Sequence, residues 1–295
     1  MTLISSGLVI LLLLTNLITG TFGQTTQEPT TRVVLTLTVT DKNGRYIGGL
    51  SKERITVLDQ ERPQEIVSFT KTDVPISVGF LFDASILNSE VWKVSQDALL
   101  KFMAESNPAN EYFLIGFDGQ THLATRFTNN RNQMSKAFDD LRRMKPSNYR
   151  NPYDAIQSGL ETVEGGQHAK RATILVSNNN DFASSLKYEA LLDQLKRLDV
   201  MLYAIRWKSS DTVFKELTSV TGGAAFYSKT AAGLADSFEI ISLEFRHQYT
   251  VEYRCESSSP GTWHSLEFQV KPLQLNDSES ILFFPRSRAG YYGRP

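Results

Sequence analysis

The apolar positions of this chain follow two different periods. Between residues 32 and 73, and again after residue 247, apolar residues alternate with polar ones, as in the run from Val33 to Asp41. A period of two is the pattern of β-strands that bury one face. Between these flanks, nearly continuous apolar runs such as Pro75–Asp83 alternate with segments of helical spacing. Such runs are typical of parallel strands that helices bury on both faces.

The central region predicts a doubly wound α/β unit. Buried strands are expected at Pro75–Asp83, Glu111–Asp118, Ala172–Ser177, Val200–Trp207 and Ala224–Ser228, with an antiparallel neighbour at His122–Phe127. Helices are expected at Asn88–Ser106, from an N-cap at Thr128 to Met144, and at Pro152–Val163, Leu186–Leu198, Thr212–Val220 and Ala231–Phe245. Strands that alternate with helices predict a mostly parallel sheet with helices on both faces.

The two flanks are predicted to form one small β-sandwich. Residues 32–73 and 248–295 are each too short to bury a stable core alone. We therefore expect them to pack together, with the α/β unit of residues 74–247 inserted between them. The alternative is two separate β segments that attach loosely to the α/β unit and leave their apolar faces uncovered.

The N-terminal segment predicts export. Residues 1–23 resemble a secretory signal peptide, with an apolar stretch centred on Leu8–Leu14 and a cleavage site near Gly23. An uncleaved membrane anchor is the alternative, because Leu3–Phe22 is long enough to cross a bilayer of ~30 Å. Residues 24–31 are then a polar linker, and the rest of the chain is expected to be secreted or periplasmic. The membrane is a partner only through an uncleaved N-terminal segment.

Charge and residue inventory exclude several classes of function. The 31 Lys and Arg residues and the 32 Asp and Glu residues give a formal net charge of -1, and there is no basic run to bind nucleic acid. Cys255 is the only cysteine, so no internal disulfide can form. We expect it to be a half-buried strand residue, with an intermolecular disulfide as the alternative. The sequence has no H-E-x-x-H motif, no G-x-S-x-G motif and no phosphate-binding loop, so we expect no enzymatic activity.

Several segments, taken in order, resemble the bacterial von Willebrand factor A (VWA)-related family of exported proteins. Those within the α/β unit are FLFDAS (Phe80–Ser85), PYDAIQSGL (Pro152–Leu160), ATILVSNNND (Ala172–Asp181) and ELTSVTGGAAFY (Glu216–Tyr227). The flanking segments are TVTDKNG, ITVLDQERPQEIVSF, FRHQYTVEY and RSRAGYY. The resemblance therefore spans Val33–Tyr292.

The resemblance implies a sheet of order 3-2-1-4-5-6 and a ligand site beyond the carboxyl ends of its strands. The order of such a sheet reverses between its first and fourth strands, here those that end at Asp83 and Ser177. In the family this position is a metal-ion-dependent adhesion site, where a carboxylate of the partner completes the coordination of magnesium or a similar hard cation. Such an ion takes oxygen ligands and keeps several waters.

The chain departs from this ligand pattern at most positions. Asp83 and Ser85 match the first two ligands, but the third position is Leu87, which has no side-chain oxygen. The distal threonine aligns with Arg150 or the residue after it, and the aspartate of the T-D-G motif aligns with Asn178. One carboxylate then remains, beside a guanidinium that repels a cation. We therefore expect no bound cofactor. Magnesium is the alternative, held by Asp83 and Ser85.

These departures predict a site that binds its partner without a metal. Arg150 can replace the ion, because a guanidinium can pair with Asp83 and still present N–H donors to an acidic partner. The predicted partner-binding residues are Asp83, Ser85, Asn88, Arg150, Asn178 and Asp181. The alternative interpretations are a solvated loop for Arg150, a helix cap for Asp83 and a turn for residues 178–180.

The predicted function is that of an exported, non-enzymatic, adhesion-type module whose ligand face lies at the carboxyl ends of the central strands. Its partner is expected to be a protein or a cell-envelope ligand with acidic groups. The alternative is a structural or assembly component of the cell envelope with a vestigial site, which binds partners through β-strand edges. Mutations at Asp83, Ser85 and Arg150 distinguish the two, since they impair binding in the first case and only folding in the second.

Overall fold

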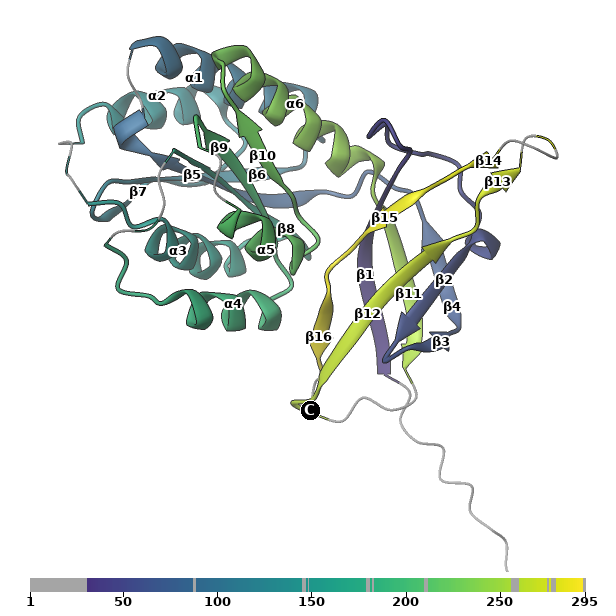
Figure 1. Cartoon of the computed structure of the whole chain (residues 1–295). Helices are drawn as coiled ribbons and strands as arrows, with labels where there is room; N and C mark the ends of the chain where they lie inside the picture. Colours follow the sequence, from purple (N-terminus) through teal and green to yellow (C-terminus); the bar gives the residue numbers. More distant parts are fainter. Residues whose placement is uncertain are drawn as a thin grey trace, which may run out of the picture.

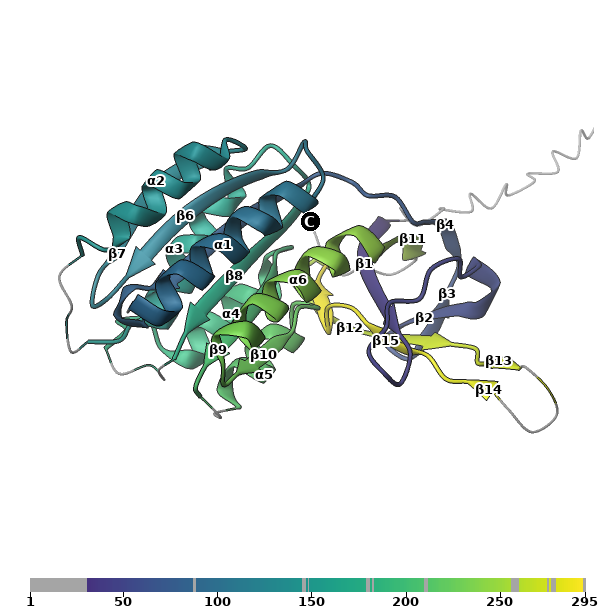
Figure 2. The same ribbon diagram turned by 90° about the horizontal axis from the view of Figure 1, so that it is seen from above.

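The computed structural model describes residues 31–86, 89–144, 147, 149–178, 181, 183–209, 212–255, 260–274, 276 and 280–293. The chain forms an α/β unit and a β-sandwich, which Figures 1 and 2 show side by side. The predicted signal segment, residues 1–23, and nearly all of the predicted linker lie outside the described residues. Within the described part, no helix combines the length and the apolar character that crossing a membrane requires.

A six-stranded sheet forms the centre of the α/β unit. Its order is β10-β9-β8-β5-β6-β7, and all neighbouring strands are parallel except β6 and β7. The strands are β5 (Ile76–Asp83), β6 (Glu111–Phe117), β7 (Thr121–Thr128), β8 (Lys170–Ser177), β9 (Met201–Trp207) and β10 (Ala225–Ser228). With β5 counted as the first strand, this is the order 3-2-1-4-5-6, so the predicted fold class is confirmed.

Two layers of helices cover the sheet (Figure 2). One face carries α1 (Ser89–Glu105), α2 (Arg131–Leu141) and α6 (Ala231–His247), and the other carries α3 (Pro152–Glu164), α4 (Tyr188–Arg197) and α5 (Val213–Ser219). Phe80 and Phe82 of β5 point into the first apolar core, and Leu81 points into the second. All eight residues of β5 are buried, because the strand is covered on both faces.

The start of α2 differs from the prediction. We expected Thr128 to be the N-cap, whereas the N-cap is Asn130, whose side-chain oxygen accepts hydrogen bonds from the N–H groups of Asn132 (2.9 Å) and Gln133 (3.1 Å). Thr128 instead ends β7, and its hydroxyl accepts the N–H of Asn130 at 3.0 Å. Both residue types can cap a helix, so composition alone could not choose between them.

The two flanks of the chain form the sandwich together. One sheet has the order β15-β1-β11-β4 and the other the order β16-β12-β2-β3. Their strands are β1 (Thr31–Thr40), β2 (Ile55–Asp59), β3 (Arg62–Gln64), β4 (Ile66–Thr70), β11 (Tyr249–Cys255), β12 (Trp263–Val270), β15 (Phe284–Arg286) and β16 (Gly290–Tyr292). The flanks pair in both sheets, through β1 with β11 and β2 with β12.

The inward-facing residues of both sheets, among them Leu37, Val57 and Val251, form a third apolar core. Cys255, which we expected to be half-buried, is fully buried in this core at the end of β11. A short hairpin of β13 (Leu273–Gln274) and β14 (Ser280–Ile281) extends from the sandwich (Figure 2).

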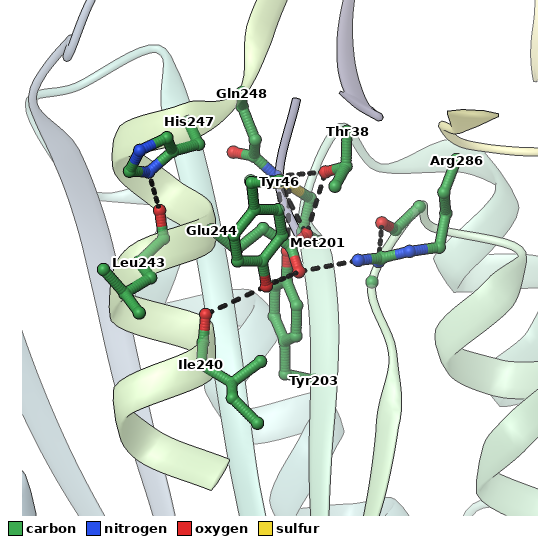
Figure 3. A network of polar contacts seen from close by, with 12 residues as sticks. Thr38, Tyr46, Met201, Tyr203, Ile240, Leu243, Glu244, His247, Gln248 and Arg286 are labelled. Carbon is green, nitrogen blue, oxygen red and sulfur yellow. Dashed lines mark hydrogen bonds and ion pairs between the residues drawn. The ribbon is translucent and has the colours of Figure 1, made fainter. Parts of the chain in front are cut away.

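A buried carboxylate joins the two parts (Figure 3). Glu244 of α6 is 1% exposed and accepts hydrogen bonds from side chains on both sides of the junction. The donors are Thr38 (2.9 Å), Tyr203 (2.6 Å) and Gln248 (3.2 Å) at Oε1, and Arg286 (2.6 Å) and Tyr46 (3.3 Å) at Oε2. Because Thr38 and Arg286 belong to the sandwich, this network helps to fix how the α/β unit meets it.

Candidate functional site

The order of the central sheet reverses between β5 and β8. The chain leaves β5 through α1 and returns in β6 on one edge of β5, whereas β8 pairs with the other edge and places Val176 opposite Phe82. In folds of this kind, ligands bind at the carboxyl ends of the neighbouring parallel strands whose connections leave in opposite directions. Asp83 and Ser177, the last residues of the two strands, lie at this position.

Asp83 is the centre of a small hydrogen-bond network at this edge of the sheet. The residue is 0% exposed. Its Oδ1 accepts the N–H (3.0 Å) and the hydroxyl (2.6 Å) of Ser85, and its Oδ2 accepts the hydroxyl of Ser177 at 3.1 Å. Ser85 reaches Asp83 because the chain forms a 3-10 turn, Ala84–Ile86, directly after β5. The structure thus brings the predicted residues Asp83 and Ser85 together and adds Ser177 to them.

The pKa of Asp83 is shifted upward by its surroundings. Burial raises the pKa above its ordinary value of 3.8, while the hydrogen bonds from Ser85 and Ser177 and the positive charge of Arg150 oppose this effect. Ionising this carboxyl group is therefore costly in the folded protein. Groups of this kind occur often at functional sites, where a bound partner compensates the charge.

Arg150 lies near Asp83 but forms its ion pair with a different carboxylate. Its Nη1 donates to Oδ1 of Asp118 (2.9 Å) and to the main-chain oxygens of Ser147 (2.6 Å) and Tyr149 (3.1 Å). Asp118, directly after β6, also accepts the N–H (2.8 Å) and the hydroxyl (2.7 Å) of Ser147. The structure therefore corrects the expected pairing of Arg150 with Asp83. The guanidinium acts on Asp83 through its charge, and its hydrogen bonds hold its own loop against β6.

The other predicted residues are spread around this edge of the sheet. Asn178 directly follows Ser177 at the end of β8 and is partly exposed. Asp181 accepts the N–H of Ser184 at 3.2 Å, which is a contact within its own loop. Asn88 lies outside the described residues. Asn178 therefore borders the Asp83 network, whereas Asp181 orders the loop that follows it.

Two residues at this edge were missed by the sequence analysis. Arg206 is fully buried near the end of β9, opposite Ser177 in the register, with its guanidinium 4.3 Å from the ring centre of Phe214. An arginine inside the apolar run VMLYAIRW was a usable signal, because a buried charge requires compensating contacts. Tyr149, next to Arg150, is 66% exposed, and nothing in its sequence context pointed to it.

A second group of possible metal ligands lies in the sandwich. Ligand atoms of Asp59, Cys255 and His264 lie within 4.8 Å of one another, and all three residues are buried. The Asp59 carboxylate already has partners, namely Nδ1 of His264 (2.9 Å) and the hydroxyls of Tyr253 (2.6 Å) and Tyr291 (2.7 Å). The residue types suit zinc, but these hydrogen bonds satisfy the buried carboxylate as it stands.

Solved structures share the fold of this chain. Proximal thread matrix protein 1 from the mussel byssus has a TM-score of 0.53 at 13% identity, over 64% of this chain and 51% of that protein. Another structure of the same protein, with zinc in its metal-ion-dependent adhesion motif, has a TM-score of 0.51 at 13% identity, over 64% and 49%. This chain thus spans about half the length of the mussel protein.

The PilB minor pilin from Streptococcus sanguinis has a TM-score of 0.46 at 12% identity, over 59% of this chain and 61% of that one, and this weaker likeness carries no argument. No protein-family model matches the sequence, and a search of curated proteins found no match. At these identities the comparisons show the fold alone, which is a VWA-like α/β fold.

Proposed function

We propose that this protein is an exported, non-enzymatic binding module that holds an acidic group of a partner protein at the carboxyl edge of its central sheet without a metal ion. The observation that carries the proposal is the Arg150 guanidinium, which Asp118 holds beside Asp83, at a position that the family resemblance aligns with a ligand loop. The predicted signal segment supports export.

The charges around Asp83 oppose a divalent cation. Asp83 accepts hydrogen bonds from neutral groups, namely the N–H and hydroxyl of Ser85 and the hydroxyl of Ser177, so Asp83 contributes the one negative charge among these groups. The positive charge of Arg150 acts on Asp83, and the nearby carboxylate of Asp118 is already paired with Arg150. Arg206 lies one residue before the end of β9, opposite Ser177. Asn178, a neutral amide that directly follows Ser177, aligns with a carboxylate of the family motif. A hard dication gains most from several anionic oxygens, so this set of donors is poor for magnesium.

The same guanidinium suits a carboxylate ligand. The side chain of Arg150 is 20% exposed, and its hydrogen bonds to described residues all use Nη1. Its Nε and Nη2 are therefore the atoms that present a two-pronged donor to a partner carboxylate, and the paired Asp118 keeps the plane of the group fixed. Tyr149, 66% exposed beside it, adds a large contact surface of the kind that is enriched at binding hot spots.

The test is isothermal titration calorimetry of the purified protein with magnesium, manganese and calcium. The same titrations are carried out on a double variant, Arg150→Thr with Asn178→Asp, which restores the missing hydroxyl and carboxylate. A matched control combines Arg62→Thr with Asn43→Asp, which makes the same chemical changes at exposed residues of the β-sandwich.

We expect no metal binding by the wild type or the control, and binding by the double variant. Saturable binding of a divalent ion by the wild type, lost in Asp83→Ala, would restore a metal-dependent mechanism and overturn the proposal. Failure of the correctly folded double variant to bind any of the three ions would contradict the assignment of Arg150 and Asn178 to ligand positions.

A further inference from the structure

A cavity of about 660 Å³ lies where the sandwich meets the α/β unit, at the amino ends of the central strands. Its lining includes the first residues of β8, Lys170 and Arg171, whereas Asp83 and Ser177 lie at the opposite ends of the strands. On the sandwich side, the consecutive residues 32–36 of β1 line the cavity. This cleft is therefore distinct from the site around Asp83.

The part of β1 that lines the cleft is paired on one side. Residues 31–37 of β1 pair with β11, but on its other side β1 pairs with β15 only over Thr38–Thr40. In the described part of the chain, no strand pairs with residues 32–36 on that second side. Ser287 directly follows β15, and its hydroxyl donates a hydrogen bond of 2.7 Å to the main-chain oxygen of Thr36. The Thr36 oxygen therefore points to the side of β1 on which β15 lies.

Because backbone groups alternate in direction along a strand, the orientation of Thr36 also fixes that of Arg32 and Val34. Residues two apart point their N–H and C=O groups to the same side, so the backbone groups of Arg32 and Val34 face the same way as those of Thr36. Val34 is also 54% exposed, which is unusual for a valine in the middle of a strand. An unpaired edge with an exposed β-branched residue is a template for another strand.

The walls of the cleft are strongly cationic. Arg32, Lys170, Arg171, Arg197 and Arg288 line it, and Asp199 is the one carboxylate among its described lining residues. Three of these cations have acidic partners: Arg32 with Glu252, Arg197 with Asp193 and Arg288 with Asp199. Nζ of Lys170 donates to the main-chain oxygen of Phe245 at 2.9 Å, and Nε of Arg171 is buried without a hydrogen-bond partner among the described residues. Lys170 and Arg171 therefore leave the cleft with excess positive charge.

We propose that this cleft binds an extended acidic peptide segment of a partner protein, which adds as a strand to the edge of β1 at residues 32–36. The backbone of β1 supplies the hydrogen bonds, and alternate acidic side chains of the segment face Arg171 and Lys170. The basic walls select against basic strands, since like charges across an interface are costly. The site is independent of the carboxyl-edge site, so either can exist without the other.

The probe is a fluorescent, end-capped hexapeptide of alternating glutamate and valine, titrated into the purified protein and followed by anisotropy. Three further peptides serve as controls: one with lysine for glutamate, one with the valines N-methylated and one with the glutamates N-methylated. The amides of alternate residues point to the same side of a strand, so either the glutamates or the valines turn their N–H groups toward β1. Whichever the register, one methylated peptide has therefore lost the N–H groups that pair with β1 and the other has kept them.

Two variants locate the binding. Val34→Pro removes an edge N–H that β11 does not use, a change that edge strands tolerate. Arg171→Glu reverses a charge in the wall, and Arg126→Glu makes the same change on the exposed side of β7 as a matched control. Circular dichroism confirms that each variant is folded.

We expect saturable binding of the acidic peptide, no binding of the lysine peptide, and a large difference between the two methylated peptides. Affinity should fall at least about tenfold in Val34→Pro and in Arg171→Glu, which corresponds to losing roughly 1.4 kcal/mol, and stay unchanged in Arg126→Glu. The proposal is overturned by absence of saturable binding, by equal binding of the lysine peptide, or by full affinity in Val34→Pro. It is also overturned if Val34→Pro abolishes a concentration-dependent dimer of the wild type in sedimentation velocity, because the edge would then pair with a second copy of the chain.

Discussion

Replacing Glu244 with glutamine tests whether one carboxylate holds the two parts of the protein together. The substitution keeps the size of the side chain and one acceptor oxygen. It removes the charge opposite Arg286, whose Nη2 lies 2.6 Å from Oε2, and places an amide donor among groups that are themselves donors (Figure 3). Glu244 is 1% exposed, so water cannot replace the lost contacts at low cost.

The expected loss is large for a change of so few atoms. Removing one partner of a buried ion pair typically destabilises a protein by about 3–5 kcal/mol, because the other charge is left without compensation. The side chain of Arg286 is 29% exposed and can reach some water, so we expect the lower end of that range. A loss of about 3–4 kcal/mol lowers the midpoint of urea unfolding by about 1–2 M for a slope of about 2–3 kcal/mol/M.

The assay is equilibrium unfolding in urea, followed by tryptophan fluorescence and by circular dichroism. Glu239→Gln is the control on the same helix, since the side chain of Glu239 is 50% exposed in its pair with Lys101, and we expect no measurable change. In a double variant, Arg286→Met should recover part of the loss caused by Glu244→Gln, because the uncompensated charge is then gone. The reasoning is refuted if Glu244→Gln costs no more than the control, or if adding Arg286→Met deepens the loss.

Two further predictions concern buried charges. Burial lowers the pKa of Lys170 to about 8 from 10.5, so its charged form opposes folding at neutral pH, and Lys170→Met should stabilise the protein by about 1–3 kcal/mol at pH 7. That gain should fade between pH 8 and pH 10.5 in urea titrations, and a gain independent of pH would contradict the assignment. Burial raises the pKa of Asp83 above 3.8, so Asp83→Asn should stabilise the protein at neutral pH, with the difference vanishing below pH 3.8. A destabilising effect of Asp83→Asn at neutral pH would show that its hydrogen bonds outweigh the cost of burying its charge.

The strands and helices could be predicted from the sequence because burial on one face or on both produces a characteristic spacing of apolar residues. The continuous apolar run of β5 and the alternation of β1 are direct consequences of the two environments. The predicted ends of the elements were less accurate. Thr128 and Asn130 are two residues apart and both can cap a helix, and the structure has Asn130 as the N-cap. The order of the sheet came from the family resemblance, since periodicity does not reveal which strands are neighbours.

The contacts of the site were harder to predict than its location. Asp83 and Ser85 are two residues apart, so a local turn is enough to join them. Two carboxylates lie within reach of Arg150, because Asp83 is opposite Phe117, the last residue of β6, and Asp118 directly follows that strand. Sequence spacing does not rank two such partners, and the outcome depends on how the loop around Ser147 folds back over Asp118.

The positive charge of the cleft could not be predicted from the sequence, for a different reason. A net charge of -1 and the absence of a basic run describe averages along the chain, whereas Arg32, Lys170 and Arg288 come from segments that only the fold brings together. The two proposed sites also lie at opposite ends of the same strands. Over the eight residues of β8, from Lys170 to Ser177, they are separated by roughly 23 Å at about 3.3 Å per residue. Effects of mutations this far apart usually add, so a change at Arg150 should leave peptide binding intact and a change at Arg171 should leave the restored metal site intact. If changes at the two ends instead alter each other's ligands, β8 is the element that joins the two sites directly, because it runs from Lys170 and Arg171 in the cleft to Ser177 beside Asp83.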